Sequence, residues 1–283
     1  MSSYSLYLIG SQATGSATAL SDLDYVCLYD DKRPDCPEFM QPHCNVSFYN
    51  PKRLMWMIDN SKLFIEHILR DGKKITATTE HERILRSYKI KKNILRSDLA
   101  DFRKMACDIE WVPSNQNGLL WAADYVYCLA RNIIFISNAL EDIFEFNFEK
   151  ATQIFLDKRD AIKEMSDFLS LRHGKYQYRS PPSSSLIDVS KLPINLNVVL
   201  SRITDESIRI NLGGKTSFES LSAVSYETLR LVERAIINLE IFDRYFLERL
   251  KNHSQYGFDL RLRAKNLVSM AVKNERDLLL ESS

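Results

Sequence analysis

Short apolar segments near the start of the chain have the pattern of β-strands. Residues 6–9, LYLI, form an apolar run that meets a Gly-Ser pair, which is typical of a buried strand entering a turn. Residues 25–28, YVCL, form a second apolar run, and residues 45–49, NVSFY, alternate polar and apolar side chains. A short apolar stretch around Ile75 follows a glycine. The pattern therefore predicts a few short strands at the start of the chain.

The remainder of the chain has longer segments in which apolar residues recur at helical spacing. The sequence is poor in glycine and proline, with eight of each in 283 residues, which also favours helices. Helices are predicted within residues 51–70, 82–107, 119–140, 148–171 (one helix or two), 196–203, 225–252 and 259–281. Residues 180–185, SPPSSS, have the composition of a linker or long loop.

Composition narrows the class of protein. The chain is 45% hydrophobic and 27% charged, which is typical of a soluble globular protein of one or two domains. A net charge of +1 gives no overall basic field, so any nucleic-acid binding must come from a local patch. Five scattered cysteines are typical of a reducing compartment. No apolar run of 18 residues and no signal-peptide pattern occur, so we expect a cytoplasmic protein without a membrane span.

The candidate chemistry lies between the first two predicted strands. Gly10 lacks a Cβ and Ser11 carries a hydroxyl, so the turn that they form can approach a phosphate closely. After ten intervening residues come Asp22 and Asp24, whose carboxylates point to the same face if this segment is a strand. Two neighbouring carboxylates repel each other unless a cation lies between them, and Mg²⁺ prefers such oxygen ligands together with substrate phosphates.

The order strand, Gly10-Ser11, helix-length gap and Asp22-Leu23-Asp24 resembles the signature of the DNA polymerase β-like nucleotidyltransferase superfamily. The spacing is similar to that of its minimal nucleotidyltransferase (MNT) branch. The motif covers less than a tenth of the chain. The alternative interpretation is a polar loop in which Asp24 only caps a turn.

The resemblance implies an α+β fold, with a small mixed β-sheet nucleotidyltransferase domain in residues 1–80 and a mostly α-helical domain in residues 81–283. It implies that Gly10 and Ser11 bind the nucleotide phosphates and that Asp22 and Asp24 hold Mg²⁺ or Mn²⁺ and are catalytic. The reaction would transfer a nucleoside monophosphate from an NTP or dNTP to a hydroxyl acceptor, with release of pyrophosphate.

The acceptor stays open at this point, because an oligonucleotide end, a nucleotide signal and a protein hydroxyl all fit the resemblance. Its long helical region makes the chain larger than the MNT antitoxins of toxin–antitoxin systems and closer in plan to nucleotidyltransferases of bacterial anti-phage defence systems that make nucleotide signals. A cognate partner protein or a homo-oligomer is therefore expected.

The third predicted strand departs from the family pattern. In the family this strand carries a third catalytic carboxylate, and the position that we align with it is Asn45. Asparagine keeps one oxygen ligand for a metal but cannot accept a proton. Three outcomes are open: reduced activity, substitution by Asp30, Asp31 or Glu38, or a catalytically weakened pseudoenzyme that binds nucleotide or a partner.

Residues 172–179, RHGKYQYR, form the one local basic-aromatic cluster, and we select Arg172 and Lys175 from it as candidate nucleotide-binding residues. The alternative is a solvated helix end before the linker. Arg131 interrupts the apolar segment 119–140 and is expected either to reach a phosphate or carboxylate or to form an internal salt bridge, for example to Asp124. A helical interaction protein with a chance motif is the remaining alternative.

Overall fold

The computed structural model describes residues 4–15, 17, 23–34, 44–179, 187–214, 226–241, 243–251, 262–267 and 269. The predictions for Asp22, Glu38 and the linker at residues 180–185 lie outside these residues. The chain divides into two compact units. We call Met1–Arg103 together with Arg131–Met165 the sheet unit, and Lys104–Ala130 together with Ser166–Ser283 the helical unit.

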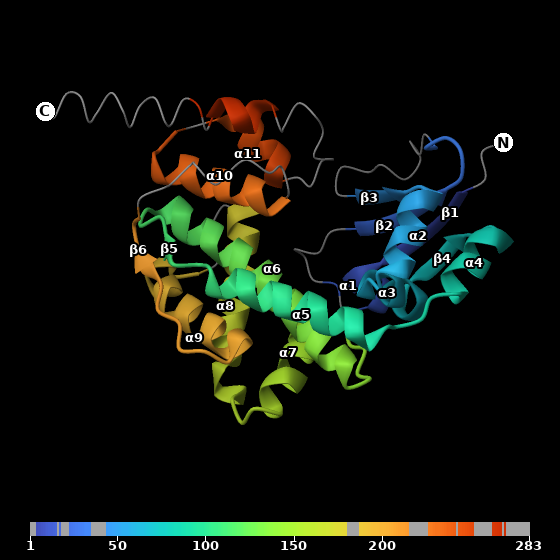
Figure 1. The fold of residues 1–283 in the computed structure, drawn as a ribbon, viewed down its shortest axis with the longest axis horizontal. Coiled ribbons are helices and arrows are strands. Elements are labelled where there is room, and N and C mark those ends of the chain that lie inside the picture. Colours follow the sequence, from blue (N-terminus) through green and yellow to red (C-terminus); the bar gives the residue numbers. More distant parts are fainter. Residues whose placement is uncertain are drawn as a thin grey trace, which may run out of the picture. The chain divides into compact units, whose positions relative to one another are not determined.

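The sheet unit contains a four-stranded sheet with the order β3-β2-β1-β4 (Figure 1). Strand β1 is antiparallel to both of its neighbours, whereas β2 and β3 are parallel, so the sheet is mixed. The strands are β1 (Tyr4–Ile9), β2 (Leu23–Tyr29), β3 (Cys44–Tyr49) and β4 (Lys73–Thr76). The predicted α+β class is confirmed, with a small mixed sheet at the start of the chain and a mostly helical remainder.

Helices pack their apolar faces against this sheet. Leu54, Ile65 and Ile68 from two helices lie in one buried cluster with Val26 and Leu28 of β2. Burial of apolar surface in this cluster is the main source of stability of the unit. The helices that lie wholly or mostly in the sheet unit are α1 (Gly10–Thr14), α2 (Pro51–Asp59), α3 (Leu63–Asp71), α4 (Thr79–Arg86), α5 (Lys92–Cys107) and α7 (Phe148–Asp157).

Side-chain caps explain where two of these helices begin. The side chain of Asn50 accepts a hydrogen bond from the backbone N–H of Arg53, and a proline follows it in the first turn of α2. Thr78 accepts in the same way from the backbone N–H of His81 at the start of α4.

The segment 82–107, which the apolar spacing predicts to be helical, contains two helices, because α4 ends at Arg86 and α5 begins at Lys92. Tyr88, in the connection, is buried in the core of the sheet unit. The hydroxyl of Ser61 accepts the backbone N–H of Lys91, so the connection gains a partner outside its own helix. Tertiary packing therefore interrupts a segment whose apolar spacing alone favours one continuous helix.

The helical unit is built mainly from α8 (Met165–Arg179), α9 (Leu192–Thr204), α10 (Tyr226–Asn238) and α11 (Arg244–Lys251), with one part of α6 (Gln116–Leu140). Two short parallel strands, β5 (Trp111–Val112) and β6 (Asn211–Leu212), join distant parts of this unit. Single 3-10 turns, Ile162–Glu164 and Val189–Lys191, precede α8 and α9. The predicted helices at residues 119–140 and 196–203 are present, and segment 148–171 contains two.

Helix α6 is the one helix of the described residues that is long and apolar enough to cross a membrane. About 78% of its most apolar window is buried inside the protein, which is what a core helix of a globular protein also shows.

The predicted helix over residues 225–252 is also interrupted. Helix α10 ends at Asn238, and Glu240 adopts a positive φ of 53°, which an α-helix does not tolerate. The side chain of Asp243 then accepts the backbone N–H of Phe246 at the start of α11. A chain reversal and a new cap thus divide an apolar stripe that reads as continuous in the sequence.

Candidate functional site

The predicted site residues of the first segment meet at one edge of the sheet. In the register of β1 and β2, Ile9 pairs with Asp24, so Gly10 follows the residue opposite this carboxylate. In the register of β2 and β3, Asp24 pairs with Asn45. Three segments that are separate in the sequence therefore place a glycine turn, a carboxylate and an amide side by side. Asp22 lies outside the described residues.

Gly10 has a backbone conformation that favours glycine. Its φ of +72° lies in the left-handed region, and a Cβ at this position would lie 3.4 Å from Oδ2 of Asp24. The preceding residue, Ile9, is the N-cap of α1 and has an apolar side chain that makes no capping hydrogen bond. The backbone N–H groups of this short first turn are therefore not capped by Ile9, and Ser11 lies among them, half-buried.

Asn45 contacts Asp24 directly. Its Nδ2 donates to Oδ1 of Asp24 over 3.4 Å, which is a long hydrogen bond, and its side chain is exposed. Carboxylate and amide oxygens are ligands that suit Mg²⁺ or Mn²⁺, so the side chains of Asp24 and Asn45 fit the predicted metal. Within the described part of the chain, no group of three or more His, Cys, Asp or Glu side chains is arranged around a common point.

Asp30, one candidate substitute for the third carboxylate, has another partner. Its Oδ1 lies 3.1 Å from Nε2 of His81. It follows the last residue of β2, six positions after Asp24, which in an extended strand corresponds to about 20 Å. Asp31 is one residue further away, and Glu38 lies outside the described residues. Neither Asp30 nor Asp31 therefore stands beside Asp24.

Sequence reasoning missed a buried Ser-His-Asp contact that joins β1, α4 and the end of β2. Oγ of Ser5 lies 2.9 Å from Nδ1 of His81 and also accepts the backbone N–H of Thr78. Ser5 is 0% exposed and His81 is 1% exposed, so no substrate reaches this hydroxyl. The three groups hold α4 on the sheet and are not a nucleophilic site. No spacing in the sequence indicates this contact, because Ser5 and His81 are 76 positions apart.

His67, on α3, is a packing residue. Its ring stacks on Phe146 with centroids 4.7 Å apart and an interplanar angle of 4°. Burial, together with the positive charge of Arg131, lowers the pKa of His67 from 6.5 to about 4. The ring is therefore neutral at neutral pH and is not a cationic phosphate ligand.

This pKa predicts an acid-sensitive contribution of His67 to stability. Between pH 6.5 and pH 4 the unfolded chain binds a proton at His67 that the folded chain does not. The free energy of unfolding is therefore expected to decrease as pH falls through this range, by at most about 3 kcal/mol. Urea unfolding from pH 7 to pH 4 of the natural chain and of His67→Phe, which keeps an aromatic stack, measures this contribution.

The neighbouring Asp71 makes the paired comparison necessary. Burial and the charge of Glu145 raise the pKa of Asp71. The contribution of this carboxyl to the free energy of unfolding therefore increases as pH falls, opposite to that of His67. Comparison with the variant separates the two groups. Parallel pH profiles for the two proteins would contradict the assignment to His67.

The two other predicted nucleotide-binding residues belong to the helical unit. Residues 172–179 form the second half of α8 and thus are a helix end, but Gln177 and Tyr178 are buried, so this end is not solvated throughout. Nε of Arg172 donates to the hydroxyl of Tyr176 over 3.3 Å, and Nζ of Lys175 lies 4.9 Å from the centroid of Tyr127. A role for Arg172 and Lys175 in nucleotide binding stays a prediction.

A buried network of charged side chains occupies the interior of the helical unit. Asp124 of α6 accepts from Nε of Arg179 over 2.6 Å and from Nη2 of Arg230 over 2.7 Å. These guanidinium groups, and not that of Arg131, are the cationic partners that the structure gives Asp124. Glu233 accepts hydrogen bonds from Oη of Tyr178 at 2.5 Å and from Nε1 of Trp121 at 3.0 Å, and Nη1 of Arg230 lies 2.9 Å from its Oε2 as an ion pair.

The charges of this network balance, since two carboxylates face two guanidinium groups. Asp124 and Glu233 are 0% exposed, so no solvent ion substitutes for a missing partner. In the sequence, Asp124 stands out only as a single acid within an apolar segment. Its partners Arg179 and Arg230 are 55 and 106 positions away, so the spacing does not identify them. The network stabilises the packing of α6, α8 and α10.

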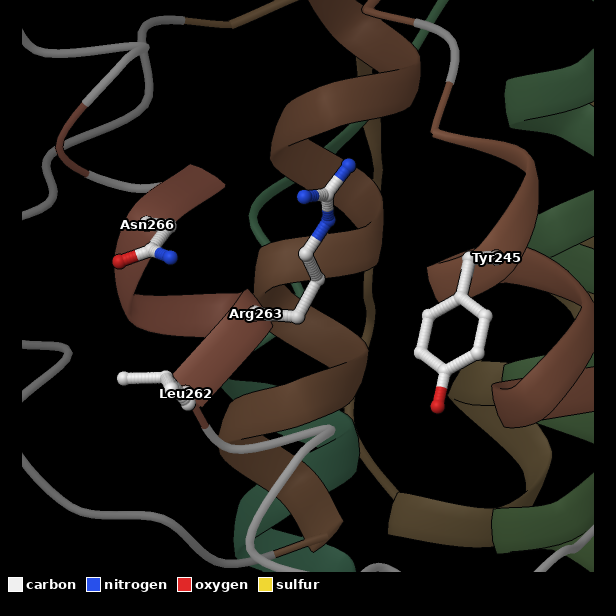
Figure 2. A pocket seen from close by; sticks show the side chains of 4 residues that line it. All are labelled: Tyr245, Leu262, Arg263 and Asn266. Carbon is white, nitrogen blue, oxygen red and sulfur yellow. The ribbon is translucent and has the colours of Figure 1, made fainter.

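A shallow surface hollow of about 400 Å³ lies elsewhere in the helical unit. Figure 2 shows Leu262, Arg263 and Asn266 on one helical segment and Tyr245 on α11. The guanidinium of Arg263 is paired with Asp243, at 2.7 Å from its Nε. The described residues that line this hollow include no carboxylate, thiol or imidazole, and we assign it no chemistry.

Comparison with known proteins identifies no relative, because no family model, no curated protein and no solved structure matches the chain. The geometry of the site is therefore the basis for any assignment of function.

Proposed function

We propose that this protein is a metal-dependent nucleotidyltransferase that transfers a nucleoside monophosphate from an NTP or dNTP to a hydroxyl acceptor. The observation that carries the proposal is the register of the three strands, which brings the Gly10 turn, Asp24 and Asn45 to one edge of the sheet. Nucleotidyl transfer requires a place where the phosphates of the nucleotide can approach the backbone, next to side-chain oxygens that can bind a divalent cation.

The residues at this edge of the sheet have separate proposed roles, which are phosphate binding and metal binding. The left-handed turn at Gly10 lets the backbone approach the β- and γ-phosphates without a side chain in the way. Ser11 offers a hydroxyl and its backbone N–H in the same turn. Asp24, with Asp22 before it in the sequence, supplies the negative charge that would hold Mg²⁺ or Mn²⁺, and Asn45 would add an amide oxygen after rotation of its side chain.

When bound, the divalent cation would polarise the α-phosphate and neutralise the departing pyrophosphate. The acceptor oxygen forms its bond to the α-phosphorus while the bond between the α-phosphorus and the bridging oxygen breaks. Pyrophosphate leaves with the bonding electrons, and the hydroxyl proton passes to water, since an asparagine at position 45 cannot accept it.

A second function is favoured by the contact between Asn45 and Asp24. The amide of Asn45 donates to the carboxylate of Asp24 at the position where the family pattern has a third acid. Two carboxylates there would repel each other without a cation, whereas Asn45 and Asp24 stay in contact without one. A nucleotide-binding protein with little or no transferase activity would keep this arrangement. The two functions share one site and differ in whether pyrophosphate is released.

Labelled nucleotides test the proposal directly. The purified chain is incubated with Mg²⁺ or Mn²⁺ and each NTP and dNTP labelled at the α-phosphate, in the presence of single-stranded oligonucleotides, and products are resolved as labelled protein and labelled oligonucleotide. We expect metal-dependent label and pyrophosphate from the natural chain and neither from Asp22→Ala/Asp24→Ala. The position of the label identifies the acceptor.

Binding without release distinguishes the second function. A nucleotide-induced thermal shift that requires Asp24, with no pyrophosphate from any nucleotide, would support the binding protein and contradict the enzyme. The absence of both the thermal shift and the product would contradict both functions.

A further inference from the structure

A basic and aromatic surface lies on the sheet unit outside the candidate site. We call it the Trp56 surface and define it by Arg53 and Trp56 of α2, Lys62 before α3, and Lys89 and Lys91 between α4 and α5. Trp56 is 43% exposed. The guanidinium carbon of Arg53 lies 4.1 Å from the centroid of its ring, and Nζ of Lys62 lies 5.6 Å from it. Two cations thus lie within about 6 Å of the ring centroid.

Hydrogen bonds make this surface continuous between segments that are about thirty residues apart in the sequence. Nζ of Lys91 donates to the backbone carbonyl of Asp59 over 3.0 Å. Oγ of Ser61 accepts the backbone N–H of Lys91 at 3.0 Å and donates to the carbonyl of Lys89 at 3.4 Å. The residues that follow Trp56 at the end of α2 and in the next turn therefore bind the connection that carries Lys89 and Lys91.

The charge of this region is strongly one-sided for a chain whose net charge is only +1. Residues 86–96 contain five cations and no acid. Two nearby lysines are paired, Lys62 with Asp98 at 2.6 Å and Lys92 with Asp142 at 2.7 Å. Arg53, Lys89, Lys91 and Arg96 are exposed and form no ion pair with a carboxylate within the described residues. Against these stands the exposed carboxylate of Asp59.

We propose that the Trp56 surface binds single-stranded nucleic acid. An exposed indole offers a face on which an unpaired base stacks, and unpaired lysines neutralise the phosphates on either side of that base. A duplex hides its base faces, so this combination favours a single strand. An acidic protein would use the cations without requiring the ring.

This inference rests on the proposed function, because it selects a nucleic-acid strand from the acceptor classes that the site leaves open. The surface and the candidate site belong to the same compact unit. A nucleic-acid strand bound to the Trp56 surface is therefore held on the same unit that would bind the nucleotide.

Tryptophan fluorescence tests the proposal, because the two other tryptophans are shielded from a ligand. Of the three tryptophans, Trp111 is 9% exposed and Trp121 is 1% exposed, so Trp56 is the one that a ligand can reach. Titration with single-stranded oligothymidylate is expected to quench this fluorescence, and the quenching is expected to disappear in Trp56→Phe. Binding is measured in parallel by anisotropy of a labelled oligonucleotide.

Charge reversal tests the contribution of the lysines. Lys89→Glu/Lys91→Glu is expected to weaken binding at least tenfold at low salt and to reduce the slope of log K against log salt by about 1.4, since each phosphate contact of a single strand contributes about 0.7. Lys150→Glu/Lys163→Glu changes two exposed lysines outside the surface by the same charge and is expected to bind nearly as the natural chain does. Lys89→Ala/Lys91→Ala is the milder second variant, and thermal melts verify the fold of each.

Three results would overturn the inference: no binding of the oligonucleotide, equal weakening by both charge-reversal pairs, or equal quenching by polyglutamate or anionic vesicles. The test is separable from that of the proposed function. Asp24→Ala is expected to bind the oligonucleotide normally while transferring nothing. Nucleotide transfer to a protein without oligonucleotide binding would overturn the Trp56 surface and leave the transferase intact.

Discussion

Replacement of Asp124 by alanine is expected to destabilise the helical unit by about 3–5 kcal/mol, which is the usual effect of leaving a buried charge without its partner. Asp124 is 0% exposed and lies between the guanidinium groups of Arg179 and Arg230. Without it, the fully buried Arg230 and the mostly buried Arg179 lose the carboxylate that they share. A loss of this size is a large fraction of the stability of a typical domain, so the variant is expected to unfold at much lower urea concentration.

The protonation state of Asp124 supports this expectation at neutral pH. Burial acts to raise the pKa of Asp124, but the positive charges of Arg230 and Arg179 outweigh it, and the pKa lies below its ordinary value. A carboxyl with a lowered pKa contributes stability that is present above the unfolded pKa, near 3.9, and is lost as pH falls. The effect of Asp124→Ala is therefore expected to be full at pH 7 and to shrink under strongly acidic conditions.

Chemical unfolding of a mutant cycle separates the pair from the rest of the network. Asp124→Ala, Arg179→Met and the double variant are unfolded in urea, and the double variant is expected to lose less than the sum of the single variants. Glu80→Ala, which removes an exposed partner of Arg83, is the control and is expected to leave the midpoint unchanged. Strict additivity, or a loss no larger than that of the control, would contradict the network.

Asp24→Asn is expected to reduce nucleotide transfer by more than about 100-fold, because the proposed cation site would lose one of its two carboxylates, and even changes outside the direct ligands commonly reduce activity 10- to 100-fold. The side chain of Asp24 is only half-buried, so the fold is expected to persist. Pyrophosphate release at saturating Mg²⁺ and nucleotide measures the effect, and a thermal melt establishes that the variant is folded. Full activity in this variant would remove Asp24 from the mechanism.

The converse substitution, Asn45→Asp, restores the acid that the family pattern has at this position. It replaces a hydrogen bond between Nδ2 and Oδ1 of Asp24 with two carboxylates in contact, so the metal-free protein is expected to melt at a lower temperature. Mg²⁺ is expected to raise the melting temperature of this variant more than that of the natural chain, with an increase in transfer. An equal response to Mg²⁺ in both proteins would contradict a shared metal site for Asp24 and Asn45.

Local patterns in the sequence determined the class of the fold and the position of its sheet. The runs LYLI and YVCL and the alternation in NVSFY correspond to β1, β2 and β3, because a buried strand and a half-buried strand leave different periodicities in the chain. Gly10-Ser11 and the following aspartates could also be selected locally, since each is defined by its residue type and spacing.

The tertiary structure alone decided the ends of helices and the partners of charged side chains. Apolar spacing reports that a segment is helical but not where a cap or a buried aromatic interrupts it, as at Tyr88 and Asp243. The partners of Asp124 and the contact of Ser5 with His81 join residues far apart in the chain, and spacing carries no information on such pairs.

The same reason explains the two surfaces on which function is proposed. The sequence determined that Gly10, Ser11, Asp24 and Asn45 have suitable chemistry, because that depends on side-chain type. Only the pairing of strands decided that Gly10, Asp24 and Asn45 meet at one edge. Trp56 and the lysines after α4 are unremarkable as separate segments, and hydrogen bonds through Ser61 and Asp59 make them one surface. Composition determines which chemistry is available, and long-range packing determines which groups act together.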